Sequence, residues 1–349
     1  MNLSTLLAQC ITCGASDLHL SSGVPPLLRL NGDLVPLTDV ALTHDALHGA
    51  LMTILPSALQ LALTQTHACD FSLEVPPLSR FRVHVFWQAR GVSAVFRVIP
   101  HQIPSLQALA APTVLHQLAH SARGLVLVTG PTGSGKSTTL AAMIHALNQT
   151  HNKHILTIED PIEFVHTPQR CLIQQRELGA HTQSFASALR AALREDPDVI
   201  LVGELRDLDT IRLAITAAET GHLVLTTLHT ASAAKTMNRI VDVFAAEEKE
   251  IVRHMLSESL NAVVSQTLCK RQDGAGRVAA YEVMLGTPAV RNLVREGKVA
   301  QLYSTIQTGR SVGMQTLDQS LASLVQQGLI DVQEAQTKAK FPESFVAAR

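Results

Sequence analysis

The stretch that decides the fold of this chain is Gly130-Pro131-Thr132-Gly133-Ser134-Gly135-Lys136-Ser137. Its spacing, a glycine, four residues and then Gly-Lys-Ser, matches the phosphate-binding P-loop. The apolar run Leu125–Thr129 before it predicts a buried strand, and Thr138–Leu147 after it predicts a helix. Strand, loop and helix in this order are the context that a P-loop needs. The alternative is a glycine-rich turn with a chance lysine, and the flanks argue against it.

The residue types in this loop suit a nucleoside triphosphate and Mg²⁺. Glycines allow backbone N–H groups to approach phosphate oxygens, and the helix N-terminus adds partial positive charge. We expect Lys136 to reach the β- and γ-phosphates and the Ser137 hydroxyl to bind Mg²⁺. The predicted cofactors are therefore ATP and Mg²⁺. The residues predicted to bind the nucleotide are Gly130, Pro131, Thr132, Gly133, Ser134, Gly135, Lys136, Ser137 and Thr138.

Composition narrows the class of protein. The chain has 349 residues, too many for one typical domain, which predicts two or three. Hydrophobic residues make up 46% of it, enough for real cores. Lys and Arg total 28 against 29 for Asp and Glu, a formal charge of -1. Domains that grip nucleic acid usually carry a basic excess. None is visible here, so no nucleic-acid partner is predicted.

Targeting and cysteine patterns predict a cytoplasmic protein. No run of about 18 apolar residues predicts a membrane-spanning helix. The N-terminus lacks the basic residues of a secretory signal, since the first Lys or Arg is Arg29. The five scattered cysteines do not look like a disulfide framework. We interpret the lone pair Cys10 and Cys13 as two packed thiols rather than a zinc site.

The predicted fold class is α/β with two domains. Residues 1–100 mix strand and helix patterns and predict a small α+β domain, followed by a proline-rich linker at 101–112. Residues 113–349 predict the ATPase domain, whose apolar strands alternate with helices as in a mostly parallel sheet. From about residue 246 we interpret the chain as mainly helical, with one short strand at 277–284. The strands predicted for the sheet are 125–129, 155–158, 199–202 and 223–228.

Carboxylates follow two neighbouring strands of the predicted sheet. Glu159, Asp160 and Glu163 come at the end of one strand, and Glu204 comes just after the next. The carboxyl ends of parallel strands face the ligand crevice. One carboxylate of the first group could polarise the attacking water, and Glu204 could reach the Mg²⁺ shell as a Walker B acid. For the first group, a solvated acidic loop is the alternative.

Two histidines, His222 and His229, bracket the apolar run of the last predicted sheet strand. Imidazole can sense a phosphate or hydrogen-bond a carboxylate. We expect both side chains near the nucleotide crevice. Metal binding is the weaker alternative, because no third ligand stands at suitable spacing.

Arginines gather in the strand-rich part of the first domain, at Arg80, Arg82, Arg90 and Arg97. Alternation along a strand puts Arg80 and Arg82 on one face. A solvated face is the default interpretation of such charges. The alternative is a set of guanidinium groups that close on phosphates across a domain or subunit boundary.

The chemistry-bearing segments, in this order, resemble the secretion ATPase superfamily of type II secretion and type IV pili. Besides the P-loop and the histidine pair, they are Glu159-Asp160-Pro161-Ile162-Glu163 and Leu193-Arg194-Glu195-Asp196-Pro197-Asp198-Val199-Ile200-Leu201-Val202-Gly203-Glu204-Leu205-Arg206-Asp207. Within the superfamily the chain is most similar to the pilus retraction ATPases. That similarity runs from about Ser4 to Phe341. It rests on Ala15-Ser16-Asp17-Leu18-His19-Leu20, Arg80-Phe81-Arg82-Val83, Ala289-Val290-Arg291-Asn292-Leu293 and Gly313-Met314-Gln315-Thr316-Leu317-Asp318.

This resemblance implies a PAS-like N-terminal domain, a RecA-like C-terminal domain and a homohexameric ring. It implies that Glu163 is the general base and that Glu204 is the Walker B acid, a metal ligand together with Ser137. The implied location is cytoplasmic, peripheral at the cytoplasmic face of the inner membrane. The implied partners are an inner-membrane pilus platform protein and a paralogous retraction ATPase. The other residues implied to act in catalysis are Lys136, His222, His229, Arg82 and Arg97. The two arginines are implied to face the phosphates, and Arg190 and Arg194 are further candidates for that role.

The sequence departs from the family pattern in a few places. Val290 stands where the retraction motif usually has Ile, and Thr226 stands where the histidine segment usually has Gly. There is no four-cysteine zinc module, which argues against the type II secretion branch. In the retraction motif, Arg291 would serve docking or coupling. Spacing alone favours an ordinary amphipathic helix with a solvated arginine.

These observations predict a hexameric ATP-hydrolysing motor that retracts type IV pili. One alternative is a nucleic-acid motor with a RecA-like core, which would need a basic stripe and stacking aromatics; aromatics are only 3% of the chain. Another is a ring that binds nucleotide without hydrolysing it, against which Lys136, Glu163 and Glu204 together speak. The third is an accessory retraction or assembly ATPase of the same superfamily.

Overall fold

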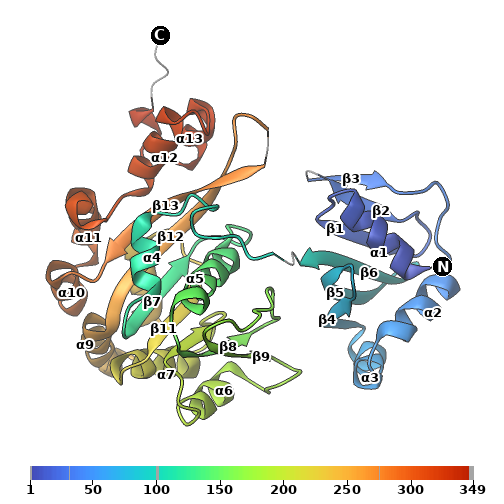
Figure 1. The fold of residues 1–349 in the computed structure, drawn as a ribbon, viewed down its shortest axis with the longest axis horizontal. Coiled ribbons are helices and arrows are strands. Elements are labelled where there is room, and N and C mark those ends of the chain that lie inside the picture. The colour runs from blue at the N-terminus through green and yellow to red at the C-terminus, as the bar shows by residue number, and fades with distance from the viewer. Residues whose placement is uncertain (1, 31, 100–101, 275, 346–349) are drawn as a thin grey trace. The chain divides into compact units, whose positions relative to one another are not determined.

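The chain divides into two compact units, residues 1–102 and 103–349, in a computed structural model. The structure describes residues 2–30, 32–99, 102–274 and 276–345. Each unit is described below by itself (Figure 1).

The predicted linker lies mostly within the second unit. Leu106 is buried in the same hydrophobic cluster as Leu115 of helix α4 (Thr113–Ala119). His101, the first residue of that linker, lies outside the described residues, as does Ala275 in the predicted break before the last strand.

The first unit is built on a six-stranded sheet in the order β3-β2-β1-β6-β5-β4, with antiparallel neighbours throughout. In β5, Phe81 and Val83 are fully buried while Arg82 between them is partly exposed. This alternation is typical of an antiparallel sheet with one covered face. The elements are α1 (Leu3–Thr12), β1 (Asp17–Ser21), β2 (Leu27–Leu30), β3 (Asp33–Pro36), α2 (His44–Ile54), α3 (Ser57–Thr66), β4 (Ala68–Val75), β5 (Ser79–Gln88) and β6 (Gly91–Ile99).

The second unit is built on a seven-stranded sheet in the order β13-β12-β7-β11-β10-β8-β9. All neighbours in it are parallel except β12 and β13. The elements from residue 124 to residue 242 are β7 (Gly124–Thr129), α5 (Lys136–Thr150), β8 (His154–Glu159), β9 (Leu172–Glu177), α6 (Phe185–Ala192), β10 (Val199–Val202), α7 (Leu208–Glu219), β11 (Leu223–Leu228) and α8 (Ala233–Asp242). Those that follow are α9 (Lys249–Ser259), β12 (Leu260–Lys270), β13 (Arg277–Leu285), α10 (Pro288–Arg295), α11 (Leu302–Thr308), α12 (Leu317–Gln326) and α13 (Val332–Lys338).

Helices cover both faces of this sheet, which explains the continuous apolar runs of its central strands. Leu125 and Leu127 of β7 point into a cluster with α6, α7, α8 and α9. Val126 and Val128 of the same strand point into a second cluster with α4 and α5. Because β7, β11, β10 and β8 are parallel, the segments that follow them all start at one edge of the sheet. The residues of the candidate active site lie at that edge.

The helical interpretation of the chain from residue 246 is wrong for residues 260–270. These form β12, which pairs with β7 on one side and β13 on the other. The run is apolar, short and interrupted by Asn261, Ser265 and Gln266, and periodicity alone cannot tell such a run from a buried helix. The predicted strand at 277–284 is confirmed as β13, and helices prevail after it.

The cysteines bear out part of the sequence analysis. All five are free, so the absence of a disulfide framework is confirmed. Cys10 is buried but Cys13 is exposed, so the prediction of two packed thiols is wrong for Cys13. In the part of the chain that the structure describes, no helix has the length and apolar character needed to cross a membrane.

Candidate active site

The P-loop joins β7 to α5 at the carboxyl edge of the sheet. Gly130, Gly133 and Gly135 have φ values of 145°, 76° and 85°, in the region that favours glycine. A Cβ on Gly130 would lie 2.2 Å from the carbonyl oxygen of Gln266, so a larger residue does not fit there. A Cβ on Gly133 would meet nothing within 4 Å. Conformation rather than crowding therefore favours glycine at that position.

Lys136 is the first residue of α5, and its side chain is buried. Its Nζ donates to the carbonyl oxygens of Gly130 and Pro131, both at 3.0 Å, and to Nδ1 of His229 at 3.4 Å. Burial lowers the pKa of Lys136, and the charges of Glu204 and Glu163 partly offset this. Because an ammonium group has three donors, these three acceptors satisfy it.

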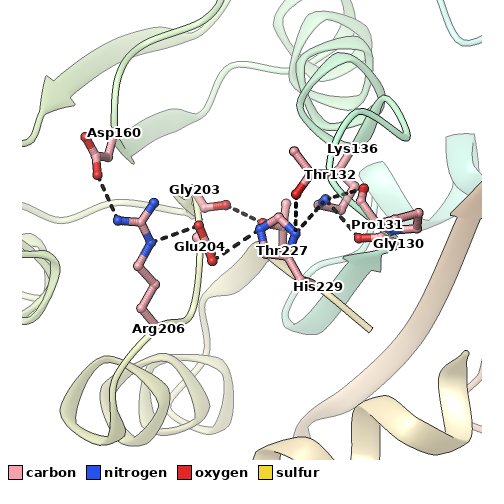
Figure 2. A network of polar contacts seen from close by, with 10 residues as sticks. All are labelled: Gly130, Pro131, Thr132, Lys136, Asp160, Gly203, Glu204, Arg206, Thr227 and His229. Carbon is pink, nitrogen blue, oxygen red and sulfur yellow. Dashed lines mark hydrogen bonds and ion pairs between the residues drawn. The ribbon is translucent and has the colours of Figure 1, made fainter. Parts of the chain in front are cut away.

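His229 connects this lysine to Glu204 (Figure 2). Its Nε2 lies 3.2 Å from Oε1 of Glu204, and its Nδ1 lies 3.4 Å from Oγ1 of Thr132. Since an ammonium group cannot accept a hydrogen bond, Nδ1 is the acceptor toward Lys136. Nε2 then carries the proton that is donated to Glu204. The partners thus assign the neutral Nε2–H tautomer to His229.

Glu204 is held from its other side by Arg206. Nε of Arg206 lies 2.9 Å from Oε2 of Glu204, and its guanidinium reaches Oδ2 of Asp160 at 3.1 Å. The hydroxyl of Thr227 on β11 donates to the carbonyl oxygen of Gly203 at 2.6 Å, which fixes the backbone just before Glu204. Arg206 thus joins the segments after β8 and β10 (Figure 2).

Glu159 and Glu163 lie beside this network. Desolvation raises the pKa of Glu159 to about 7, although Thr157 and Gln175 donate hydrogen bonds to its Oε1 at 2.7 and 3.2 Å. The backbone N–H of Glu163 also donates to this carboxyl, and the charge of Glu163 adds to the upward shift. Glu163 acts electrostatically on Lys136 as well. Glu163 and Glu204 thus both lie near enough to Lys136 to act on it electrostatically, and their catalytic roles stay a prediction.

His222 does not share this location. It precedes β11 while His229 follows it, so the two histidines lie at opposite edges of the parallel sheet. A six-residue strand separates them by about 20 Å. Nδ1 of His222 pairs with the carbonyl oxygen of Ala217 at the end of α7. The expectation that both histidines lie near the nucleotide crevice is therefore wrong for His222 within this chain, and its catalytic role stays a prediction.

The predicted phosphate-facing arginines are divided between the two units. Arg82 and Arg97 are directly opposite each other on β5 and β6 of the first unit. Arg97 pairs with Asp17, whose side chain is only 5% exposed, at 2.8 Å. In the second unit, Arg190 makes a 3.5 Å exposed contact with Asp209, and Arg194 is exposed. A role for these arginines at phosphates stays a prediction.

The loop fits the phosphates of a nucleotide on its own geometry. Oγ of Ser134 is buried and has no hydrogen-bond partner among the described residues. The N-terminus of α5, a 15-residue helix, opens into the loop beside the Lys136 ammonium. Ser137 in the first turn and Glu204 offer the hard oxygen donors that Mg²⁺ prefers. Thr138 follows in the same turn and is half-buried.

Gln266 contacts the P-loop and was missed by the sequence analysis. It lies on β12, and its side chain reaches both the loop and α5. A single glutamine in an apolar run carries no sequence signal of such a role.

Comparison with known proteins gives this geometry its family. The family model described as Type II/IV secretion system protein matches residues 69–337. The type IV pilus retraction ATPase PilT of Pseudomonas aeruginosa is 58% identical over 345 residues, which cover 99% of this chain and 100% of that protein. A twitching motility protein of Neisseria gonorrhoeae is 56% identical over 320 residues, covering 92% of this chain and 86% of the relative.

Solved structures agree with the sequence relatives. The crystal structure of the pilus retraction motor PilT with bound ADP matches with a TM-score of 0.91 at 45% identity. The match covers 99% of this chain and 98% of that one. The predicted α/β fold with a smaller N-terminal domain is confirmed. The chain thus belongs to the type II/IV secretion system protein family, the family that its P-loop, acidic segments and histidine segment resemble.

Proposed function

We propose that this chain is the ATP-hydrolysing motor of type IV pilus retraction. The observation that carries the proposal is one continuous polar network, Lys136–His229–Glu204–Arg206–Asp160, which runs from the P-loop to the acidic segment after β8. The near full-length similarity to PilT supports the pilus as the load on this motor.

The nucleotide would bind by its phosphates. Backbone N–H groups of the P-loop and the Lys136 ammonium would hold the β- and γ-phosphates. Ser137 and Glu204 would hold Mg²⁺, which neutralises phosphate charge when bound. Lys136 would exchange its present acceptors for phosphate oxygens, which are stronger acceptors because they are charged.

Hydrolysis would depend on Glu163 to orient the attacking water. Its carboxylate acts electrostatically on Lys136, which supports a position near the phosphates. Glu159 receives the backbone N–H of Glu163 and thereby fixes that segment. Glu159 is thus a positioning residue, and Glu163 is free to accept a proton from water.

Nucleotide occupancy would rearrange the segments that end the central strands. His229 accepts from Lys136 in the present state, and phosphates that take over Lys136 would remove that contact. His229 and Arg206 each contact one carboxylate oxygen of Glu204, so a cation bound by Glu204 would compete with them for these oxygens. Phosphate binding would in this way move the segments after β10 and β11.

Assembly would place further groups at the phosphates. We propose a homohexamer at the cytoplasmic face of the inner membrane, docked on a pilus platform protein. In that ring Arg82 and Arg97 would face phosphates across a domain or subunit boundary. Arg97 would have to leave Asp17 to do so.

Turnover and nucleotide binding measured on three variants test this function. Glu163→Gln should bind a fluorescent ADP analogue normally and hydrolyse ATP about a hundredfold more slowly or worse. Lys136→Ala should lose both activities. Glu219→Gln, an exposed carboxylate at the end of α7, is the matched control and should behave as wild type. Normal hydrolysis by Glu163→Gln would move the base to another residue.

A nucleic-acid motor is the rival function to test. The neutral charge balance and the 3% aromatic content disfavour it. Salt-dependent binding of single-stranded or duplex DNA by the full chain at physiological ionic strength would favour a nucleic-acid motor instead.

A further inference from the structure

We propose that Gln266 is a positioning residue for nucleotide binding, holding one peptide of the P-loop in the orientation that phosphates require. Gln266 is 4% exposed and lies on β12, outside every segment assigned to the site from sequence. Its Nε2 donates to the carbonyl oxygen of Ser134 at 2.6 Å. Its Oε1 accepts from the hydroxyl of Thr139, in the first turns of α5, at 2.8 Å.

The contact with Ser134 fixes the direction of a phosphate-binding donor. In a trans peptide, the carbonyl of one residue and the N–H of the next point in opposite directions. Gln266 holds the carbonyl of Ser134 on the β12 side, so the N–H of Gly135 is directed to the other side. Gly135 has φ 85° and no Cβ, and such a residue can rotate its peptide easily. A fixed hydrogen bond to Ser134 therefore suppresses a flip that would turn the donor away from an anion.

Two glycines of the loop leave room for Gln266, one for its side chain and one for its backbone. A Cβ on Gly135 would lie 2.8 Å from Nε2 of Gln266, and a Cβ on Gly130 would lie 2.2 Å from its carbonyl oxygen. Two glycines of the motif thus make room for Gln266, in addition to allowing phosphates to approach. The conformation of the P-loop therefore depends on its contacts with β12 as well as on the space that a ligand needs.

Gln266 is itself anchored by the neighbouring strand. It stands opposite Tyr281 of β13, whose backbone N–H donates to Oγ of Ser320 at 3.1 Å. The side-chain amide of Gln315 donates to the carbonyl oxygen of Tyr281 at 2.9 Å. β12 is therefore tied to the segment around α12, and Gln266 projects from a rigid support.

The test replaces Gln266 with methionine, which has similar length and no charge, and so does not repel phosphates. The matched control is Gln336→Met, because Gln336 on α13 also donates its amide to a backbone carbonyl, that of Phe345, and takes no part in the support of Gln266. The probes are a fluorescent ADP analogue and its displacement by inorganic pyrophosphate, which reports the phosphate site without the base.

Gln266→Met should raise the Kd of both probes about tenfold or more, since it leaves the Ser134 carbonyl unpaired and the Gly135 donor free to turn. The KM for ATP should rise in proportion while kcat falls less. Gln336→Met should bind within about twofold of wild type. A merely structural role would lower the unfolding temperature without changing these constants. Wild-type Kd values in folded Gln266→Met protein would overturn the proposal.

Two further variants keep the result decisive. Thr139→Val removes only the acceptor-side contact of Gln266 and should weaken ADP binding about threefold; unchanged affinity would count against the proposal if Gln266→Met did not fold. The inference rests on the proposed role of the P-loop. Normal ADP binding by Lys136→Ala would refute the role of the P-loop itself. If Lys136→Ala loses ADP binding while Gln266→Met binds ADP normally, only the positioning role of Gln266 is refuted.

Discussion

Replacing Arg291 with alanine should loosen α10 from the end of α9 without affecting nucleotide binding. Nε of Arg291 donates to the carbonyl oxygen of Gly286 at 2.8 Å, and its Nη1 donates to that of Glu258 at 2.7 Å. Glu258 lies in the last turn of α9, where carbonyls lack helical partners and the helix carries partial negative charge. Neither sequence-based interpretation, a docking arginine or a solvated one, included this internal contact.

The expected loss follows from these two contacts. A hydrogen bond from a charged donor contributes about 1.5–3 kcal/mol when buried. Arg291 is only half-buried, so we expect a total of about 1–3 kcal/mol for both bonds, part of it from the aliphatic stem. Arg295 on the same helix provides the matched control. It is 45% exposed and pairs with the Glu258 carboxylate at 2.5 Å, an exposed pair that contributes less than about 1 kcal/mol.

Urea unfolding and hydrogen exchange would measure this difference. Arg291→Ala should lower the free energy of unfolding by more than Arg295→Ala does, and should speed exchange of the α10 amides. Both variants should bind ADP as wild type does. The reasoning is refuted if Arg291→Ala is no more destabilising than Arg295→Ala. Normal twitching of cells that carry Arg291→Ala at normal protein levels would remove any coupling role from this helix.

The site and its surroundings support three further predictions. Lys136→Ala should reduce ATP turnover to background, because no other described ammonium is placed in the loop; a wild-type rate in a steady-state assay would contradict this. The pKa of Glu159 is raised from 4.5 to about 7, so between these two pH values the folded state binds more protons than the unfolded state. The free energy of unfolding should therefore fall as pH rises from 4.5 to about 7, by at most about 3 kcal/mol. Glu159→Gln should flatten this slope and Glu219→Gln should not. Thr226 is fully buried, and its hydroxyl has no hydrogen-bond partner among the described residues. Thr226→Val should therefore leave the free energy of unfolding in urea unchanged or raise it by about 1 kcal/mol, and a clear decrease would disprove this.

Features defined by short-range pattern were predictable from the sequence. The P-loop, its strand and its helix follow from local spacing and periodicity. The approach of Glu163 and Glu204 to Lys136 follows from one topological rule, since parallel strands end at the same edge of a sheet. The same rule, applied to both ends of β11, separates His222 from His229, because residues that precede and follow one strand lie at opposite edges.

Features that depend on long-range pairing were not predictable from the sequence. Residues 260–270 look as much like a buried helix as a strand, and only pairing with β7 and β13 decides between them. Gln266 could not be assigned to the site until that strand was placed. The pairing of Arg206 with Asp160 was not predicted, because the two residues are 46 positions apart in the chain. The Arg291 contacts likewise join residues far apart in sequence.

Pilus number and twitching in a strain whose only copy carries Glu163→Gln test the central claim most directly. ATP would still bind in that strain, but the motor could not turn over. The account predicts an excess of surface pili and loss of twitching, at wild-type levels of the protein. Wild-type pili with normal twitching would contradict hydrolysis by Glu163, and cells without surface pili would show that this ATPase assembles the fibre rather than retracting it.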